Sequence, residues 1–356
     1  MKVYNNYPLY KINAFKVRVS TRFFAKVKRE EDLNIIFSNP KLKKEKLFIL
    51  GQGFNTLFTT NFKGLILKIE IKGINKIKES KNEVILEVGA GEDWIKLVDY
   101  TLDKKLFGLE NLSLIPGSVG AAPVQNIAAY GQSFEDVFVS LSAYNIETGK
   151  TEKFTKNKCQ FSYRDSFFKK NGKNNFIITK VRLRLIKIFK NEISYHSRYG
   201  SLEEELKKFS KPPYSAKDIS YAVTRIRKRK FPDWKKLGTA GSFFLNPVIT
   251  KKKLKKLQEV YPEIQYYPVD KLSYPKRNDP TFKHNNYVKI PAGWLFEELG
   301  WKGKRLGDVG TSSEQSLVVI NYRNAKPKDI LNFTKAMARD FKNNFNINLE
   351  PEVIII

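Results

Sequence analysis

The sequence predicts an α+β fold with more than one domain. Its 356 residues exceed the length of one average domain. Short aliphatic runs that meet glycines precede helical patterns, without a steady alternation of strand and helix. Apolar residues make up 41% and aromatic residues 13% of the chain, which is enough for hydrophobic cores and excludes a disordered chain.

The first half of the chain predicts mainly strands around one helix. Residues 93–106 carry apolar side chains at helical spacing, and Asp93 stands where an N-cap is expected. The predicted strands are aliphatic or β-branched runs, the first three of which meet glycine nearby. They are 47–50, 65–69, 84–88, 137–146 and 176–189.

The second half predicts mainly helices. A polar segment at 207–221 precedes a helical run at 222–229, and Phe231-Pro232-Asp233 marks a domain boundary. Pro327 suits the first turn of a helix. The further helices are expected at 251–260, 292–299 and 327–342, the strands at 317–321 and 349–356, and a surface loop at 268–286.

Charge and composition limit the function classes. The net charge of +29 indicates either attraction to polyanions or lysines spread over solvated faces, and their dispersion favours the second, so nucleic acid is not the expected partner. One cysteine and two histidines exclude an internal disulfide and disfavour a metal site. The N-terminus lacks an apolar leader and no run reaches transmembrane length, so we expect a soluble cytoplasmic protein without a membrane partner.

A glycine-rich and alanine-rich stretch at 108–131 is the most informative part of the sequence. Glycine allows a ligand to approach the backbone closely and allows positive φ, and Pro116 fixes φ before the turn at Gly117. Gly89-Ala-Gly91 and Gly51-Gln-Gly53 lie upstream. Together these segments predict a cradle of backbone N–H groups for a flat, partly anionic cofactor of the flavin type.

The segment Gly51-Gln-Gly53-Phe54-Asn55-Thr56 follows the predicted strand at 47–50. By itself it indicates equally a tight turn capped by Asn55 or a pyrophosphate site made of backbone N–H groups. Its occurrence with the glycine-rich stretch favours cofactor binding.

Three polar clusters carry candidate chemistry. Tyr163-Arg164-Asp165 is either a surface salt-bridged turn or a fixed cation that polarises a carboxylate or carbonyl. Ser242 follows two glycines, but no histidine lies in a nucleophile-elbow context, which favours a proton donor over a hydrolase nucleophile. Glu352 is either a solvated strand end or a functional carboxylate, and Cys159 reads as a small buried residue and not as a nucleophile.

The motifs occur in a characteristic order: GQGFN, GAGEDW, GLENLSLIPGSVGAAPVQNIAAYG, FSYRDSFFK, GSFFLNP, AGWL and LEPEV. From about residue 47 to the C-terminus this series resembles the UDP-N-acetylenolpyruvoylglucosamine reductase (UDP-N-acetylmuramate dehydrogenase) family. The segment 190–235 resembles the longer, type I-like subtype of that family.

The resemblance implies a fold and a domain plan. The fold would be a vanillyl-alcohol-oxidase/PCMH-type FAD-binding domain of two subdomains plus a C-terminal α+β substrate domain. The expected boundaries are 1–71 and 72–231 for the subdomains and 232–356 for the substrate domain, with the last strand returning to the first subdomain. A monomer is expected.

The resemblance also implies a reaction. NADPH would reduce non-covalently bound FAD, and UDP-N-acetylglucosamine enolpyruvate would then be reduced to UDP-N-acetylmuramate for peptidoglycan synthesis. Hydride would pass from the flavin N5 to C3 of the enolpyruvyl group, and C2 would be protonated. Ser242 would be the proton donor, and Arg164 and Glu352 would stabilise the enolate.

The same resemblance assigns binding residues, and no metal is implied. The residues expected on FAD are Gly51, Gly53, Phe54, Asn55, Thr56, Ile115, Pro116, Gly117, Ser118, Gly120, Ala121, Gln125, Asn126, Ala128, Tyr130, Gly131 and Ile178. The residues expected on the substrate are Tyr130, Tyr163, Arg164, Tyr199, Arg227, Lys230, Ser242, Asn246, Tyr267 and Glu352, with Lys230 and Tyr199 near the diphosphate and uridine.

The chain departs from the family pattern in three places. Tyr10-Lys-Ile-Asn13 stands near the position of the usual Asn-Thr-Phe-Gly, residues 312–316 lack a histidine, and the loop 268–286 is longer than expected. Two other functions remain open. A related oxidase with covalent FAD is disfavoured because 47–131 contains no histidine, and a non-catalytic binding protein is disfavoured because Arg164, Ser242 and Glu352 are all present.

Overall fold

The computed structural model describes residues 1–189, 202–269 and 286–356. Within them the chain forms two compact units, each assembled from three segments. Unit 1 comprises Met1–Asn6, Arg22–Gln52 and Lys63–Lys228, and unit 2 comprises Tyr7–Thr21, Gly53–Phe62 and Arg229–Ile356. Both units contain helices and strands, which confirms the predicted α+β class.

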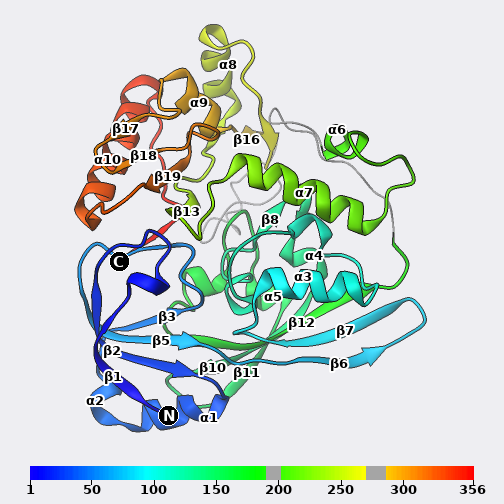
Figure 1. Cartoon of the computed structure of the whole chain (residues 1–356), viewed down its shortest axis with the longest axis vertical. Helices are drawn as coiled ribbons and strands as arrows, with labels where there is room; N and C mark the ends of the chain where they lie inside the picture. The colour runs from blue at the N-terminus through cyan, green and yellow to red at the C-terminus, as the bar shows by residue number, and fades with distance from the viewer. Residues whose placement is uncertain (190–201, 270–285) are drawn as a thin grey trace. The chain divides into compact units, whose positions relative to one another are not determined.

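Unit 1 is built on an antiparallel five-stranded sheet in the order β11-β10-β12-β7-β6. Its long strands β6 and β7 run side by side as a hairpin (Figure 1). The strands are β6 (Ile74–Glu79), β7 (Glu83–Gly89), β10 (Phe138–Asn145), β11 (Thr151–Thr155) and β12 (Phe176–Ile186).

A second sheet, in the order β1-β2-β5-β3, lies mostly in unit 1. Its strands β3 and β5 are parallel, with Leu47 opposite Leu65. The strands are β1 (Val3–Pro8), β2 (Ser20–Val27), β3 (Leu47–Leu50) and β5 (Phe62–Ile69), and a short pair β8 (Ala128–Ala129) and β9 (Gln132–Ser133) lies in the glycine-rich stretch.

The helices of unit 1 include the predicted one with its predicted cap: the Asp93 carboxylate accepts a hydrogen bond from Lys96 N at 3.0 Å. The α-helices are α1 (Glu30–Ser38), α2 (Pro40–Lys43), α3 (Trp94–Asp103), α4 (Phe134–Val137), α5 (Lys156–Cys159), α6 (Leu202–Lys207) and α7 (Ala216–Lys230, whose last two residues belong to unit 2). The 3-10 helices are η2 (Glu110–Leu112), η3 (Val119–Ala121) and η4 (Phe167–Lys169).

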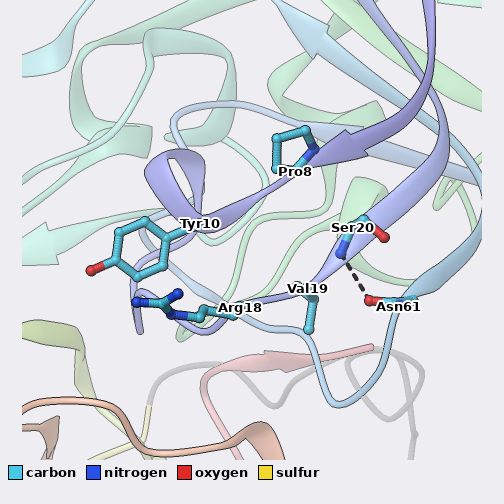
Figure 2. A pocket seen from close by; sticks show the side chains of 6 residues that line it. All are labelled: Pro8, Tyr10, Arg18, Val19, Ser20 and Asn61. Carbon is cyan, nitrogen blue, oxygen red and sulfur yellow. Dashed lines mark hydrogen bonds between the residues drawn. The ribbon is translucent and has the colours of Figure 1, made fainter.

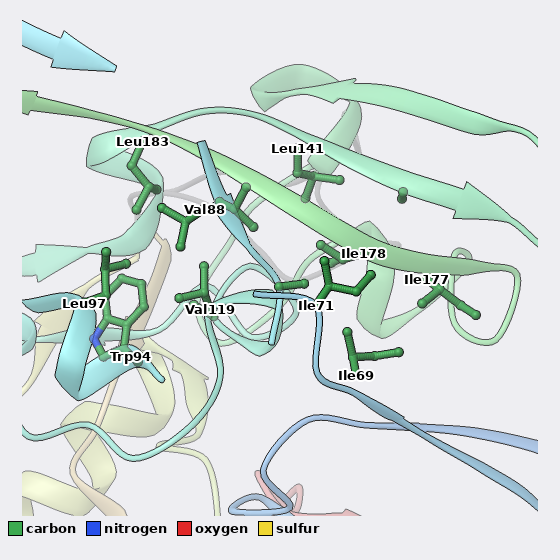
Figure 3. Packing of buried hydrophobic residues seen from close by; sticks show 14 of the residues in the cluster. Ile69, Ile71, Val88, Trp94, Leu97, Val119, Leu141, Ile177, Ile178 and Leu183 are labelled. Atoms are coloured by element: carbon green, nitrogen blue, oxygen red, sulfur yellow. The ribbon is translucent and has the colours of Figure 1, made fainter. Parts of the chain in front are cut away.

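The hydrophobic core of unit 1 holds the glycine-rich stretch in place. Trp94 and Leu97 of α3 pack with Val88 of β7, Leu183 of β12 and Val119 of η3 (Figure 3). Trp94 is 1% exposed and the other four are fully buried. Burial of one such side chain contributes about 1.5–3 kcal/mol, so Val119 anchors the middle of the stretch to the sheet.

Unit 2 contains a sheet in the order β13-β19-β18-β17, a sheet in the order β14-β16-β15 and a parallel pair of β4 and β20. Helix α10 packs beside β18 and β19 (Figure 1). The strands are β4 (Thr56–Leu57), β13 (Gly238–Ser242), β14 (Val248–Thr250), β15 (Tyr267–Pro268), β16 (Tyr287–Lys289), β17 (Arg305–Leu306), β18 (Val309–Thr311), β19 (Val318–Asn321) and β20 (Ile354–Ile355).

Three helices of unit 2 confirm the patterns of the last third of the sequence: α8 (Lys251–Val260), α9 (Ala292–Glu298) and α10 (Pro327–Phe345). The 3-10 helix η1 (Tyr10–Ile12) also belongs to unit 2 and was not predicted. Pro327 is at the first turn of α10, as predicted. Within the described ranges, every helix is too short or too polar to span a bilayer.

Two elements differ markedly in extent from the predictions. Helix α7 begins at Ala216, whereas the polar segment 207–221 was predicted to lie outside the helix. The predicted strand 349–356 contains only β20, at 354–355, as a regular strand. Of the predicted loop 268–286, residues 270–285 lie outside the described residues.

Candidate active site

In unit 1 the three glycine-rich segments of the sequence meet. A Cβ at Gly51 would collide with Ser118 Oγ, and a Cβ at Gly120 would lie 2.6 Å from Ala90 Cβ. The Gln52 amide donates to the Asp93 carboxylate at 2.8 Å. Close contact between the segments therefore favours glycine at these positions, whether or not a ligand also lies against them.

Backbone hydrogen bonds hold the stretch against residues 90–94. Trp94 N donates to Gly117 O at 2.9 Å, and Gly120 N donates to Ala90 O at 2.8 Å. Val119 N donates to Glu92 O at 2.9 Å. Ala90 belongs to the Gly89-Ala-Gly91 segment that the sequence already placed in the cradle, whereas the contact of Asp93 with Gln52 was not predicted.

Gly117 borders open space. Its φ is +148°, and a Cβ built on it meets no atom within 4 Å. Ser118 follows at 3% exposure, and Gly51 touches Ser118. Small residues beside open space let a flat group approach the backbone closely, so these residues fit the flavin predicted from the sequence.

The segment 161–166 is docked on the glycine-rich stretch and is not a surface turn. The Arg164 guanidinium donates to Ala128 O at 2.9 Å, and the Ser166 hydroxyl donates to Val124 O at 2.8 Å. The Asn126 amide donates to Ser162 O at 3.2 Å. Asp165 is 3% exposed, which excludes the surface-turn alternative and leaves Arg164 as a fixed cation.

Arg164, within this segment, and Cys159, just before it, have the following surroundings. Arg164 adopts φ of +51°, and its guanidinium carbon lies 5.7 Å from the centre of the Tyr163 ring, within cation–π range. Cys159 is fully buried, and this burial raises the pKa of its thiol to about 12. The thiol is therefore a buried filler, as predicted, and cannot act as a nucleophile near neutral pH.

A second arginine joins Arg164 in unit 1. Arg227 of α7 donates through Nε to Leu114 O at 3.1 Å and forms a hydrogen bond with Tyr130. Burial lowers the pKa of the Arg227 guanidinium, and the nearby charge of Arg164 lowers it further, while Tyr130 opposes the shift. The Asn111 amide donates to Tyr130 O at 2.7 Å and fixes the backbone there.

In unit 2 the end of β13, which carries Ser242, and the segment that carries Glu352 are joined through neighbouring backbone groups. Glu352 N donates to Phe243 O at 2.8 Å, and Leu245 N donates to Glu350 O at 2.9 Å. The Asn55 amide donates to Glu352 O at 3.0 Å. The predicted serine, carboxylate and Asn55 therefore lie on one hydrogen-bonded set of segments, and Glu352 is half-buried there and not at a solvated strand end.

The atypical N-terminal segment packs against Gly53. Ala14 N donates to Gly53 O at 3.0 Å, and a Cβ at Gly53, where φ is +79°, would collide with Ile12 O. The buried Asn13 amide donates to Leu9 O at 2.8 Å and to Val17 O at 3.0 Å. Asn13 thus shapes this turn, a role that the sequence pattern did not reveal.

The remaining predicted residues fall into three groups. Gln125, Asn126, Thr56 and Ile178 are buried, and Ile115 is partly buried against the core of unit 1. Asn246 accepts a hydrogen bond from Ala292 N at 3.0 Å. The Phe54 ring lies beside Trp234, and the Tyr267 ring lies beside Lys289. Lys230 lies beside the Phe231 ring. Tyr199 lies outside the described residues, and Pro116, Ala121 and Gly131 belong to the glycine-rich stretch.

The predicted residues divide between the units. Unit 1 carries Arg164, Tyr130, Tyr163, Arg227 and the glycine-rich stretch. Unit 2 carries Ser242, Glu352, Asn55, Asn246, Tyr267 and Lys230. In unit 1 Arg164 contacts the glycine-rich stretch at Ala128 O, and in unit 2 Asn55 and Phe243 contact the backbone of Glu352. Within the described ranges, no group of three histidine, cysteine or acidic residues is placed to hold a metal ion.

One hollow of about 500 Å³ in unit 2 is lined by none of the predicted site residues. Figure 2 shows the Arg18 guanidinium beside the Tyr10 ring, 5.7 Å from its centre. Ser20 N donates to Asn61 Oδ1 at 2.9 Å across the same hollow. The other lining residues are Pro8 and Val19.

Comparisons with known proteins decide the family. Residues 21–155 match the FAD binding domain family, and residues 233–356 match the C-terminal domain of UDP-N-acetylenolpyruvoylglucosamine reductase. The reductase of Flavobacterium johnsoniae is 41% identical over 356 residues, with all of both chains covered. The chain belongs to the UDP-N-acetylenolpyruvoylglucosamine reductase family. The reductase of Amoebophilus asiaticus is 42% identical, again over all of both chains.

Membership of the reductase family confirms the fold predicted from the motifs. The chain has a PCMH-type FAD-binding domain together with the reductase C-terminal domain. A solved UDP-N-acetylenolpyruvylglucosamine reductase from Thermus caldophilus has the same fold, with a TM-score of 0.65 at 20% identity, and 99% of this chain and 98% of that chain are covered. The family is one of FAD-dependent oxidoreductases.

Proposed function

We propose that this chain reduces UDP-N-acetylglucosamine enolpyruvate to UDP-N-acetylmuramate, with NADPH as electron donor, in peptidoglycan precursor synthesis. The observation that carries the proposal is that similarity to the reductase family extends over all 356 residues, so the FAD-binding and reductase-specific parts are both present. We further propose that the enzyme acts in the cytoplasm as a monomer.

FAD would be held non-covalently by the cradle around Gly117, with Gly51 and Ser118 beside it. When bound, FAD supplies hydride-transfer chemistry. The open space at the position of a Gly117 Cβ supports this assignment. Asn126 would act by shaping the stretch, because its side chain hydrogen-bonds to Ser162 and Glu135.

Ser242 would protonate the substrate. Addition of hydride at C3 of the enolpyruvyl group leaves negative charge on C2 and its carboxylate, and C2 must then receive a proton. A positioned proton donor contributes roughly 10²- to 10⁴-fold to such a step. Ser242 is half-buried at the end of β13, directly after Gly241, whose φ is +76°.

Arg164 and Glu352 would stabilise the enolate. Arg164 is held by Ala128 O, so its charge is fixed before the substrate binds. A preorganised donor at a developing oxyanion contributes about 2.7–4 kcal/mol. The backbone of Glu352 is fixed by Phe243 O and by the Asn55 amide, which would fix the point from which its side chain extends.

The remaining finer assignments are also proposals. Lys230 and Tyr199 would contact the diphosphate and uridine, and Tyr163, Asn246 and Tyr267 would line the sugar nucleotide. The chain would belong to the longer, type I-like subtype, and the domain plan 1–71, 72–231 and 232–356 stays a prediction.

An anaerobic visible spectrum tests the function. The purified protein is followed through addition of NADPH and then of UDP-N-acetylglucosamine enolpyruvate. We expect flavin absorbance to bleach with NADPH and to return with the sugar nucleotide. A flavin that bleaches but ignores the sugar nucleotide would contradict the substrate, and a protein that cannot be loaded with FAD would contradict the enzyme assignment.

A further inference from the structure

Helix α8 of unit 2 carries a dense cluster of lysines. Five of its ten residues are lysines and one, Glu259, is acidic, so the helix has a net charge of +4. Four of the lysines are exposed and Lys253 is half-buried. The α8 lysine cluster consists of Lys251, Lys252, Lys253, Lys255 and Lys256.

The opposite face of α8 holds the helix in unit 2. Leu254 and Leu257 are 5% and 7% exposed and lie three residues apart, on one face of the helix. The helix packs beside β14 and β16 (Figure 1). The Tyr261 ring, directly after the helix, meets the Trp294 ring edge to face at 5.8 Å between ring centres. The lysines are therefore presented by a packed helix of the fold.

The charge of the α8 lysine cluster is not neutralised within unit 2. Among the described residues, none of its five ammonium groups has an ion-pair partner. Lysines of the second sheet of unit 1 contrast with this, since Lys26 and Lys68 both pair with the Glu70 carboxylate, at 3.4 and 3.0 Å. Like charges four residues apart on a helix, such as Lys252 and Lys256, repel each other. An anionic partner would relieve this repulsion.

Exposed apolar side chains lie at both ends of the cluster. Val248, in β14 just before the helix, is 38% exposed, and Val260, the last residue of α8, is 69% exposed. Tyr266, six residues further on, is 52% exposed. Lysines next to exposed apolar and aromatic side chains are typical of segments that lie in the headgroup region of a bilayer.

The chemistry of the cluster favours a lipid surface over other polyanions. Arginine is preferred where single phosphates are recognised by shape, and α8 contains no arginine. Lysine is depleted at interfaces between proteins. Lysine clusters on an amphipathic helix are instead attracted to the diffuse negative charge of anionic lipid headgroups.

We propose that the α8 lysine cluster is a docking surface for an anionic phospholipid bilayer, with Val260 and Tyr266 entering its headgroup region. Dispersion of lysines along the whole chain argues against a polyanionic partner, but α8 gathers five of them on one exposed element. Adsorption of this kind needs no membrane-spanning helix, and it is independent of the proposed reaction.

Sedimentation with lipid vesicles tests the proposal. The purified full-length protein is mixed, in about 0.1 M salt, with vesicles of phosphatidylcholine containing about one third phosphatidylglycerol, and separately with vesicles of phosphatidylcholine alone. The test variant replaces Lys252, Lys255 and Lys256 by glutamine, which keeps a high helix propensity. The melting temperature of each protein is recorded.

A second triple variant is the matched control. It replaces Lys41, Lys43 and Lys44 by glutamine and so removes the same charge from another exposed lysine run, at α2 of unit 1. Any loss of vesicle binding that follows from net charge alone would appear equally in both variants.

We expect the wild-type protein to bind the phosphatidylglycerol vesicles and not the neutral ones. The α8 variant should bind them roughly 100-fold more weakly, since each lysine near an anionic surface contributes about 5-fold. The α2 variant should bind less than about 3-fold more weakly, and about 0.5 M salt should release the wild-type protein.

Three results would overturn the proposal. Absence of wild-type binding would remove the lipid surface as partner, and equal loss in the two triple variants would remove α8 as its site. Binding of a single-stranded RNA oligonucleotide that depends on α8, with no binding of vesicles, would assign the cluster to nucleic acid.

Discussion

The backbone just before Ser242 has an irregular conformation. Gly241 has φ of +76° with open space where its Cβ would be, and the pairing of β13 with β19 is irregular between Thr239 and Ser242. Phe243, the next residue, is held by Leu317 O and by Glu352 N. The backbone of Ser242 is thus fixed by its neighbours, so replacing its side chain should affect chemistry more than folding.

Replacement of Ser242 by alanine should separate the two half-reactions. We expect NADPH to reduce the flavin at the wild-type rate, because no proton from Ser242 is needed there. Turnover of the enolpyruvyl substrate should fall roughly 10²- to 10⁴-fold. Stopped-flow absorbance of each half-reaction measures this. Ser242→Cys is the matched control, since a thiol can still donate a proton, and normal turnover by Ser242→Ala would remove Ser242 from the mechanism.

Cys159 should be chemically silent in the native protein. Its burial and a thiol pKa of about 12 leave roughly 10⁻⁴ of the thiol ionised at pH 8. We expect a chromogenic disulfide reagent to label native protein negligibly over an hour and to label one thiol per chain in denaturant. Rapid labelling of the native protein would show that α5 opens readily.

The glycine-rich stretch is the element on which cofactor retention depends. At Gly117 an added Cβ meets no protein atom, although φ of +148° disfavours any other residue. Its substitution should therefore act on two quantities, the conformational free energy of the turn and the space left for the cofactor. A second glycine with positive φ and open space at its Cβ serves as the control.

Gly117→Ala should lose FAD, whereas Gly307→Ala should not. Gly307 also has positive φ, +60°, and open space at its Cβ, but it joins β17 to β18 next to the exposed Leu306. Both variants should melt a few degrees lower through backbone strain. We expect only Gly117→Ala to purify with markedly less flavin, measured by the ratio of absorbance at 450 and 280 nm. Equal flavin content in the two variants would place the cofactor elsewhere.

Elements with a clear period were predictable from the sequence. The spacing of apolar residues located α8, α9 and α10, and the aliphatic runs located β3 and β7. Helix α7 was placed too late because its first residues, from Ala216, are largely polar, yet they close a small apolar cluster with α6. Local pattern cannot show that closure, since it depends on tertiary packing.

The candidate site was predictable as motifs and not as contacts. Glycine spacing marked Gly51 and Gly120, but their need for glycine arises from Ser118 and Ala90, far away in the sequence. Asn13 gave no signal, because its role consists of hydrogen bonds to main-chain oxygens of Leu9 and Val17. Contacts of this kind depend on where the chain returns, which no local periodicity encodes.

At the scale of the whole molecule, the chain passes between the units several times. Unit 2 contains residues 7–21 and 53–62 from the N-terminal part together with residues 229–356. Phe15 pairs with Phe243, and β4 pairs with β20. The N-terminal segments of unit 2 are therefore completed only by the C-terminal third.

A fragment of residues 1–231 should not fold cleanly. Phe15, Leu57 and Phe58 are fully buried in the complete chain, and in the fragment they lose partners from residues 232–356. We expect the fragment to bind a hydrophobic dye and to be cleaved by protease within residues 7–21 and 53–62, whereas the complete chain resists both. A fragment that melts cooperatively and resists protease would show that unit 1 folds without unit 2.

The parallel pairing of β20 with β4 has a consequence for synthesis on the ribosome. Thr59 Oγ1 donates to Ile356 O, 297 residues later and at the end of the chain. At about 5–20 residues per second, translation takes roughly 15–60 s to supply that partner. During this interval the edge of β4 stays unpaired in every nascent chain, so the need for a chaperone should grow with the time that translation takes. Loss of a few residues at 354–356 should leave the edge of β4 unpaired permanently.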